Sequence, residues 1–382
     1  MPRMLSQIPL SLYIHIPWCV RKCPYCDFNS HEMRENISED LYIERLIVDL
    51  ETQLIAVNNR ALISIFFGGG TPSLFTPKSI EKIIKKVKER IAFAENIEIT
   101  LEANPGTVDN ARFLGFREAG INRLSIGIQS LQDEKLKNLG RIHHREAALR
   151  AIDAAVNAGF NNFNLDLMHG LPQQSLEEAC QDLKDALLFH PPHLSWYQLT
   201  IEPNTFFHYQ PPTLPNDDIL WEIQEQGQLI LQNAKLNQYE ISAYAQTHFE
   251  CIHNKNYWEF GDYLGIGAGA HSKMTNVEKQ IIFRQSRIKN PRDYLNPNKN
   301  LIANEKILTE KELIFEFLLN ALRLTKGVSN ALFVKCTGLS LSHLEPTLSI
   351  LKDKNLMMRD SQVLCTTPLG QRYLNDVIGM FL

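Results

Sequence analysis

The sequence predicts an α/β protein: an incomplete parallel (β/α) barrel of about six strands, followed by a C-terminal winged-helix-like domain. Short runs rich in Ile, Leu and Phe alternate with helical patterns through the first two thirds of the 382 residues, as in βα units with right-handed crossovers. Distinctive polar residues follow one run after another, whereas an open doubly wound sheet gathers its site at a single switch point. A barrel therefore fits this distribution better.

Six strand-like runs define the predicted barrel, and helical segments separate them. The runs cover residues 12–17, 63–72, 97–105, 123–129, 163–172 and 194–203. A helix is predicted over 39–56, where leucines recur near helical spacing, and a basic amphipathic helix over 77–91. Because parallel strands end at the same edge, the polar residues that follow them are expected to converge there.

The rhythm changes near residue 211. A helical pattern over 217–236 precedes a stretch rich in Gly, Asn and aromatic residues (253–272), and the Asn-, Pro- and Lys-rich stretch 289–304 is predicted to be a linker. Three helices and a short hairpin are predicted after residue 305. The predicted organisation is a barrel at 1–210, a barrel extension with linker at 211–300, and a winged-helix-like domain at 301–382.

Composition and charge disfavour several functional classes. A net charge of −4 does not favour general electrostatic binding to nucleic acid or to anionic membranes. Residues 301–382 carry 9 Lys and Arg against 8 Asp and Glu, so a basic DNA-reading face is not expected there either. With no apolar run of 18 residues and no signal-type segment, the predicted location is the cytoplasm.

Three of the seven cysteines lie close together after the first predicted strand. Cys19, Cys23 and Cys26 have the spacing C-x3-C-x2-C. Four thiolates would saturate a 4Fe–4S cluster, whereas three leave one iron open to a further ligand. The alternative is a zinc site completed by His15 or His31. The remaining cysteines are scattered and are predicted to be small core residues: Cys180, Cys251, Cys336 and Cys365.

The cysteine loop, the turn "FFGGGTPS" and the segment "NLDLMHGLP" resemble the radical SAM superfamily, in which a 4Fe–4S cluster binds S-adenosylmethionine (SAM). Within it the chain resembles, over nearly its whole length, the branch that holds oxygen-independent coproporphyrinogen III oxidase and related heme chaperones. The resemblance implies a cluster on the three cysteines. It implies SAM-binding positions at Tyr13, Tyr25, Gly69, Gly70, Thr71, Glu102, Gln129, Arg141 and Asp166.

Each implied position suits a group of SAM. The glycine turn offers its backbone to the methionine amine, and Glu102 lies near the amine and the sulfonium, where negative charge is favourable. Gln129 and Asp166 are implied to hold the ribose hydroxyls. Arg141 is implied to pair with the SAM carboxylate. Tyr13 and Tyr25 are implied to flank the cluster and SAM.

Two features separate the oxidase from the chaperone. Phe28 stands where the oxidase pattern has a further cysteine, and "HNKNYW" (253–258) matches the H-N-x-x-Y-W motif of the chaperone branch. A histidine nitrogen can ligate heme iron and aromatic rings can stack on the macrocycle. His253, Tyr257 and Trp258 are therefore predicted to bind heme, and Cys251 is a disfavoured second ligand.

The resulting hypothesis is a heme chaperone that delivers heme to hemoproteins such as respiratory enzymes, with the cluster and SAM gating transfer or dimerisation. The alternative is the oxidase, which removes a hydrogen atom from a porphyrinogen propionate so that carbon dioxide leaves. A nucleic-acid-binding regulator is the third and weakest class. The resemblance also implies a cluster-dependent homodimer and peripheral membrane association through acceptor proteins, and whether the chain is an enzyme stays open.

Overall fold

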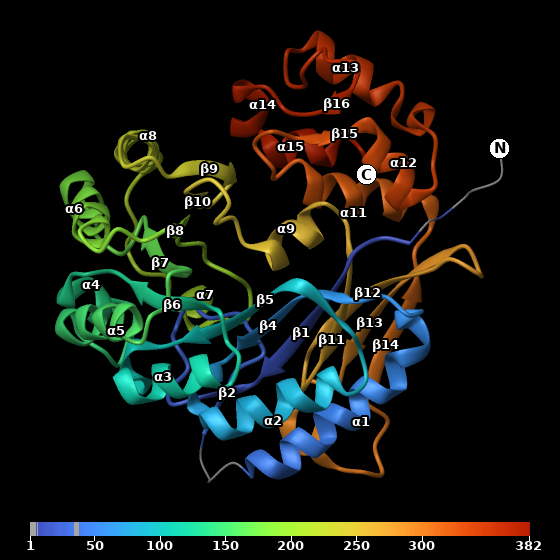
Figure 1. The fold of residues 1–382 in the computed structure, drawn as a ribbon. Helices are drawn as coiled ribbons and strands as arrows, with labels where there is room; N and C mark the ends of the chain where they lie inside the picture. The colour runs from blue at the N-terminus through green and yellow to red at the C-terminus, as the bar shows by residue number, and fades with distance from the viewer. Residues whose placement is uncertain (1–4, 6, 34–37) are drawn as a thin grey trace.

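A computed structural model describes residues 5, 7–33 and 38–382 (Figure 1). Its main feature is one mixed sheet in the order β14-β13-β12-β11-β1-β4-β5-β6-β7-β8-β10-β9. Adjacent strands from β11 to β8 are all parallel. These strands are β11 (Asp262–Ile266), β1 (Leu10–Ile16), β4 (Leu62–Gly69), β5 (Phe93–Ala103), β6 (Arg123–Gln129), β7 (Phe163–His169) and β8 (His193–Gln198).

The predicted parallel (β/α) array is confirmed, and each of its six strands overlaps the predicted run. What the prediction missed are the strands that extend the sheet on both sides. β11 lies parallel to β1, with Leu10 opposite Asp262. The antiparallel additions are β9 (Asn237–Glu240), β10 (Ala243–Ala245), β12 (His271–Asn276), β13 (Ile281–Arg287) and β14 (Ile302–Ile307).

Helices cover the outer face of the parallel strands, and α1, α2 and α3 lie side by side there (Figure 1). Their starts are set by local capping: Ser38 accepts the N–H of Leu41 at the start of α1, and Ser175 and Glu178 form a capping box on α6. The helices of this part are α1 (Glu39–Val57), α2 (Pro77–Lys88), α3 (Asn110–Glu118), α4 (Asp133–Asn138), α5 (Arg145–Asn157), α6 (Leu176–Leu187), α7 (Phe206–Tyr209), α8 (Asp217–Asn233), α9 (Ile252–Trp258) and α10 (Pro291–Leu295).

The predicted linker at 289–304 is wrong, because this stretch contains α10 and the start of β14. Tyr294 is fully buried and its hydroxyl donates to Asp49 Oδ2 at 2.8 Å. Arg45 Nε donates to the Tyr294 carbonyl at 2.7 Å. Long-range contacts to α1 thus order a segment whose composition alone suggested a loop.

The C-terminal part has its own hydrophobic cluster, built around Phe317, Phe333 and Leu351. It contains more helices than the three predicted, since η3 (Leu341–Leu344) and these helices are present: α11 (Glu310–Ala321), α12 (Asn330–Thr337), α13 (Thr347–Asp353), α14 (Pro368–Arg372) and α15 (Leu374–Gly379). β15 (Val328–Ser329) pairs with β16 (Val363–Leu364), and Met357 bridges Thr366. The segment limits at 210 and 300 stay predictions.

No helix within the described residues is long and apolar enough to cross a bilayer.

Buried histidines are expected to make the stability of this fold depend on pH. His15, His143 and His169 are buried, and burial lowers the pKa of each to about 4. In the unfolded chain these histidines take up protons near pH 6.5, whereas in the folded chain they stay neutral until about pH 4. The free energy of unfolding therefore falls as pH drops from about 6.5 toward 4, by up to about 1.4 kcal/mol per pH unit for each histidine.

Urea unfolding at pH 7.5 and pH 5.0 measures this loss. His169→Gln is expected to reduce it, because Gln cannot take up the proton, whereas the exposed His208 is the control and its replacement leaves the loss unchanged. Equal losses in the wild type and His169→Gln would contradict the assignment.

Candidate functional site

The three clustered cysteines lie on the loop that follows β1. Within this loop, the short strands β2 (Trp18–Cys19) and β3 (His31–Glu32) pair with each other. All three line one cavity of about 290 Å³, called here the first cavity. Each thiol contacts a polar group at 3.6 Å: Cys19 meets Thr71 Oγ1, Cys23 meets Arg141 Nη1, and Cys26 meets Ser30 Oγ. The loop therefore presents three separate thiols to a common space, as sequence reasoning predicted.

The number of clustered thiols bears on the choice between cluster and zinc. Cys19, Cys23 and Cys26 are the three cysteines among the described residues that line the cavity. A zinc site needs four ligands on one ion, whereas a 4Fe–4S cluster takes each thiolate on a different iron. Burial raises the pKa of the Cys19 and Cys26 thiols, so iron binding releases protons here. The arrangement fits the cluster.

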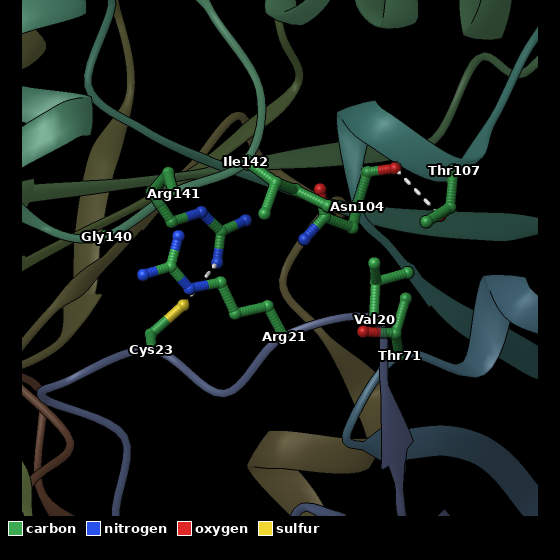
Figure 2. Close-up of a pocket in the computed structure, with 9 residues that line it drawn as sticks. All are labelled: Val20, Arg21, Cys23, Thr71, Asn104, Thr107, Gly140, Arg141 and Ile142. Carbon is green, nitrogen blue, oxygen red and sulfur yellow. Dashed lines mark hydrogen bonds between the residues drawn. The ribbon is translucent and has the colours of Figure 1, made fainter. Parts of the chain in front are cut away.

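Arg141 joins the cysteine loop to the barrel. Its guanidinium contacts the Cys23 sulfur, as Figure 2 shows. It also donates to the Gly127 carbonyl at 2.9 Å. Its buried Nε has no hydrogen-bond partner among the described residues. A half-buried cation beside the thiols, with a free donor, suits an anionic group bound in the first cavity.

The glycine turn at the end of β4 is clamped onto the cysteine loop. Gly70 N–H donates to the Ile16 carbonyl at 2.7 Å, and Thr71 N–H donates to the Trp18 carbonyl at 2.8 Å. A Cβ on Gly70 would lie 2.5 Å from the Trp18 oxygen, so no larger residue fits. Gly69 has φ +116°, which glycine adopts readily. The turn and the loop thus form one rigid wall.

Two carboxyl groups face this wall from β5 and β7, which have β6 between them. Glu102 on β5 accepts the Gly69 N–H at 3.1 Å, and burial together with the nearby Asp166 charge raises its pKa to about 8. Asp166 on β7 accepts from Ser125 and Asn164 at 2.8 Å, and burial raises its pKa too. The ionised form of a buried carboxyl group is stabilised when a cation binds beside it. The amine and sulfonium of SAM are such cations, so the residues present fit that cofactor.

Most of the predicted SAM-binding residues converge on the first cavity. The predicted SAM-binding residues that line it are Tyr25, Gly69, Gly70, Thr71, Glu102, Gln129, Arg141 and Asp166. Gln129 has φ +69° and accepts the Tyr197 hydroxyl at 2.8 Å. The structure places Tyr13 elsewhere, in the wall of a second cavity.

This second cavity, of about 560 Å³, adjoins the first and shares part of its wall: Phe28, Gly69, Glu102, Ser125 and Asp166. His253 and Tyr257 of α9 line it beside Tyr13 and Phe66. The His253 ring stacks on Phe66 with centroids 5.0 Å apart. The two adjoining cavities therefore bring together parts of the chain that are far apart in sequence. One is the chaperone-type motif on α9, and the other is the set of strand ends expected to bind SAM.

The hydrogen bonds around His253 determine which of its two ring nitrogens carries no hydrogen. Its Nδ1 lies 3.0 Å from Ser64 Oγ, and the Ser64 hydroxyl donates to Ser11 Oγ at 2.7 Å. Because Ser64 has already donated its only proton, its oxygen accepts, so Nδ1 carries the hydrogen and Nε2 keeps its lone pair. Burial lowers the His253 pKa to about 3. A neutral imidazole with a free Nε2 is a metal ligand.

Trp258 and Cys251 do not reach the cavity. Trp258 packs against the C-terminal hydrophobic cluster, with the Arg323 guanidinium 4.3 Å from its ring centroid. Its ring also meets the Tyr257 ring edge to face, with centroids 4.3 Å apart, on the side of Tyr257 outside the cavity lining. Cys251 is fully buried, its thiol lies 3.5 Å from Glu98, and burial raises its pKa to about 12. The expected stacking role of Trp258 is therefore not supported by its position.

Sequence reasoning missed several residues of the second cavity. They are His15, Arg123, Asn164, His193, Ser195 and Tyr263. Three of them, Arg123, Asn164 and His193, lie at the beginnings of strands, whereas the predicted site residues lie at or beyond the strand ends. A polar residue within an apolar strand run was the available signal.

Comparisons with known proteins agree with this geometry. The radical SAM superfamily model matches residues 13–186, and the HemN C-terminal domain model matches residues 308–373. The heme chaperone HemW of Haemophilus influenzae is 50% identical over 378 residues, which cover 98% of each chain. That of Escherichia coli is 45% identical over 379 residues, covering 99% of this chain and 100% of the relative.

Coproporphyrinogen III oxidase (HemN) from Escherichia coli has the same fold: a TM-score of 0.83 at 22% identity, covering 98% of this chain and 90% of the other. The cofactors of the radical SAM superfamily are a 4Fe–4S cluster and SAM, and both find suitable donors in the first cavity. Both matches cover nearly the full length of this chain. This chain therefore belongs to the radical SAM superfamily and, within it, to the heme chaperone HemW family.

Proposed function

We propose that this chain is a heme chaperone that binds heme in the second cavity and delivers it to hemoproteins such as respiratory enzymes. The observation that carries this is His253, a buried neutral histidine whose Nε2 is left free at a 560 Å³ cavity. Heme iron takes such a nitrogen as an axial ligand. The names of the relatives at 50% and 45% identity support the proposal.

Each cofactor has its proposed residues. Cys19, Cys23 and Cys26 hold the cluster, and Tyr257 contacts the heme that His253 ligates. SAM lies on Tyr25, Gly69, Gly70, Thr71, Glu102, Gln129, Arg141 and Asp166. Tyr13, with its hydroxyl 2.9 Å from His15 Nδ1, belongs to the heme side. Because the cavities share Glu102 and Asp166, SAM in the first cavity changes the wall that heme touches in the second.

The family context adds three expectations. We expect the chain to act in the cytoplasm, to form a homodimer that depends on the cluster, and to meet membranes only peripherally through acceptor proteins. Nucleic acid is not an expected partner. The oxidase alternative loses support from Phe28, which lines both cavities at the position where the oxidase pattern has a further cysteine.

His253→Ala is expected to weaken heme binding by more than about tenfold, because the axial nitrogen is lost. A titration of the cluster-loaded protein with ferric heme, followed by the Soret band, measures both the affinity and the ligation. His208→Ala is the matched control, since His208 is exposed and outside both cavities. Ser64→Ala is expected to weaken binding by about tenfold with a shifted Soret band, because it removes the group that orients the imidazole.

Unchanged heme affinity in His253→Ala would contradict the proposal. So would conversion of coproporphyrinogen III by the reconstituted wild-type protein with SAM and a reductant, which would establish the oxidase instead.

A further inference from the structure

Arg123 is a buried cation without a full set of partners. It is the first residue of β6, is 2% exposed and lines the second cavity. Its Nε has no hydrogen-bond partner among the described residues. Glu98 Oε2 stands 3.9 Å from that nitrogen, which is too far for a hydrogen bond. A guanidinium is rarely left in this condition inside a protein.

The Glu98 carboxylate already accepts hydrogen bonds from other groups. It accepts the N–H of His253 and the N–H of Ile252, each at 3.1 Å, and lies 3.5 Å from the Cys251 thiol. It therefore holds the start of α9 and offsets part of the Arg123 charge without occupying the guanidinium fork. The same carboxylate places Arg123 next to the residue proposed to ligate iron.

The other groups near Arg123 do not supply an anion that satisfies it. His193 is neutral, because burial lowers its pKa well below the usual value, and both its ring nitrogens are engaged, by Asn164 at 2.7 Å and Tyr239 at 2.9 Å. Asp166 is held by Ser125 and Asn164. Lys289, which is exposed, adds a second cation to the lining of this cavity. The wall thus offers a fork-shaped donor and a flexible ammonium to an anionic ligand.

Heme carries two carboxylates on one edge and an iron at its centre. We infer that Arg123 binds a heme propionate carboxylate in the second cavity while His253 ligates the iron. This assignment rests on the proposed heme chaperone function and adds to it the group that orients the porphyrin. Guanidinium and carboxylate form paired, charge-assisted hydrogen bonds, which suit a fixed orientation. Lys289 is a second contact for the other propionate.

The test compares ferric heme with its dimethyl ester, which lacks both carboxylate charges, on the wild type and on Arg123→Gln. The wild type is expected to bind heme at least about tenfold more tightly than the ester. Arg123→Gln is expected to lose most of this preference, with only the smaller share from Lys289 remaining, and its Soret band is expected to be unchanged because His253 still ligates. A preference for heme that persists undiminished in Arg123→Gln would overturn the assignment.

Failure of the proposed function gives a different result, since His253→Ala would then leave the affinity and Soret band of both ligands unchanged. A carboxylate of SAM is the other source of the same chemistry. If Arg123→Gln weakened SAM binding and left heme binding intact, the carboxylate would be that of SAM and the heme assignment would be wrong.

Two further variants guard against a folding defect. Arg123→Gln leaves Glu98 buried without its cation, so Glu98→Gln/Arg123→Gln removes both charges together. Arg123→Lys keeps the charge but loses the fork, and is expected to retain only part of the preference for heme. Cluster content and thermal unfolding confirm that each variant is folded before titration. Loss of most of the preference in the double variant supports the assignment, and an undiminished preference overturns it.

Discussion

Replacing Cys23 with alanine is expected to remove nearly all bound iron and the visible absorption of the cluster from anaerobically purified protein. Cys23 is one of the three thiols that line the first cavity in the described part of the chain, so two would remain to hold four irons. The variant also leaves Arg141 beside the site without the sulfur it contacts at 3.6 Å. Iron and sulfide assays with the absorption spectrum measure the result.

Cys365→Ala is the matched control. Cys365 is a half-buried thiol of the C-terminal part, in contact with the Thr325 carbonyl at 3.5 Å, and its loss is expected to leave iron content unchanged. Wild-type protein that contains zinc and no iron would contradict the cluster, as would full iron content in Cys23→Ala.

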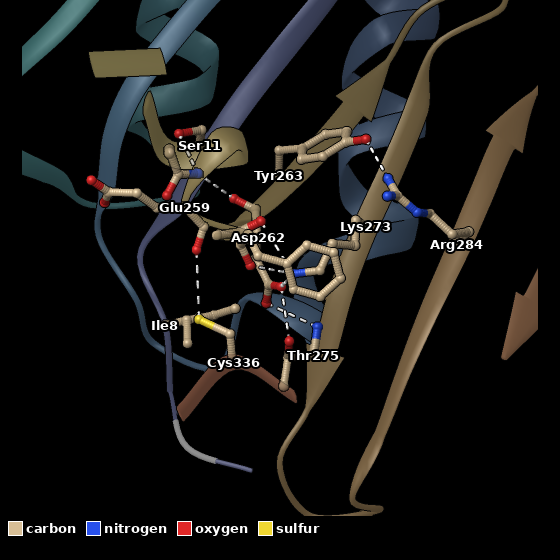
Figure 3. Close-up of polar contacts among 12 residues, drawn as sticks. Ile8, Ser11, Glu259, Asp262, Tyr263, Lys273, Thr275, Arg284 and Cys336 are labelled. Atoms are coloured by element: carbon tan, nitrogen blue, oxygen red, sulfur yellow. Dashed lines mark hydrogen bonds and ion pairs between the residues drawn. The ribbon is translucent and has the colours of Figure 1, made fainter. Parts of the chain in front are cut away.

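Lys273→Met is expected to lower the free energy of unfolding by about 3 kcal/mol, the lower end of what breaking a buried ion pair costs. Lys273 and Asp262 are 1% and 0% exposed, and their charged atoms are 3.1 Å apart (Figure 3). Lys273 Nζ also donates to the Phe260 and Gly261 carbonyls at 2.7 and 3.2 Å. Methionine fills the space but satisfies none of these acceptors. Arg60, at 2.7 Å from Asp262, limits the loss.

Urea unfolding of the apoprotein measures this difference. Lys82→Met, which breaks an exposed pair with Asp40, serves as the control and is expected to change stability by no more than about 0.5 kcal/mol. Equal effects of the two substitutions would show that the Lys273 network contributes no more than a surface pair.

The Lys273 network also illustrates a part of the fold that the sequence did not reveal. Asp262 begins β11, and Lys273 lies on β12. Neither strand was predicted, because the stretch from 253 to 272 is rich in Gly and Asn, and its strand character comes from pairing with β1 some 250 residues earlier. The segment 289–304 failed as a linker for the same reason: Tyr294 is ordered by Asp49 of α1.

What the sequence determined by itself was local. Alternating strand and helix patterns gave the parallel array, and the spacing of Cys19, Cys23 and Cys26 gave the cluster loop. Residues such as Glu102 and Asp166 could be placed together because parallel strands end at one edge. These features depend on periodicity and on neighbours in the chain, which one sequence displays.

Only the tertiary structure decided how the site is divided. It placed Tyr13 beside His253 in the second cavity and outside the lining of the first, and it packed Trp258 against the C-terminal cluster. It also left Arg123 at the second cavity with no hydrogen-bond partner for its Nε among the described residues. Each of these outcomes depends on contacts between residues far apart in the chain. Side-chain direction and the satisfaction of a buried charge are set by those contacts, and no local pattern encodes them.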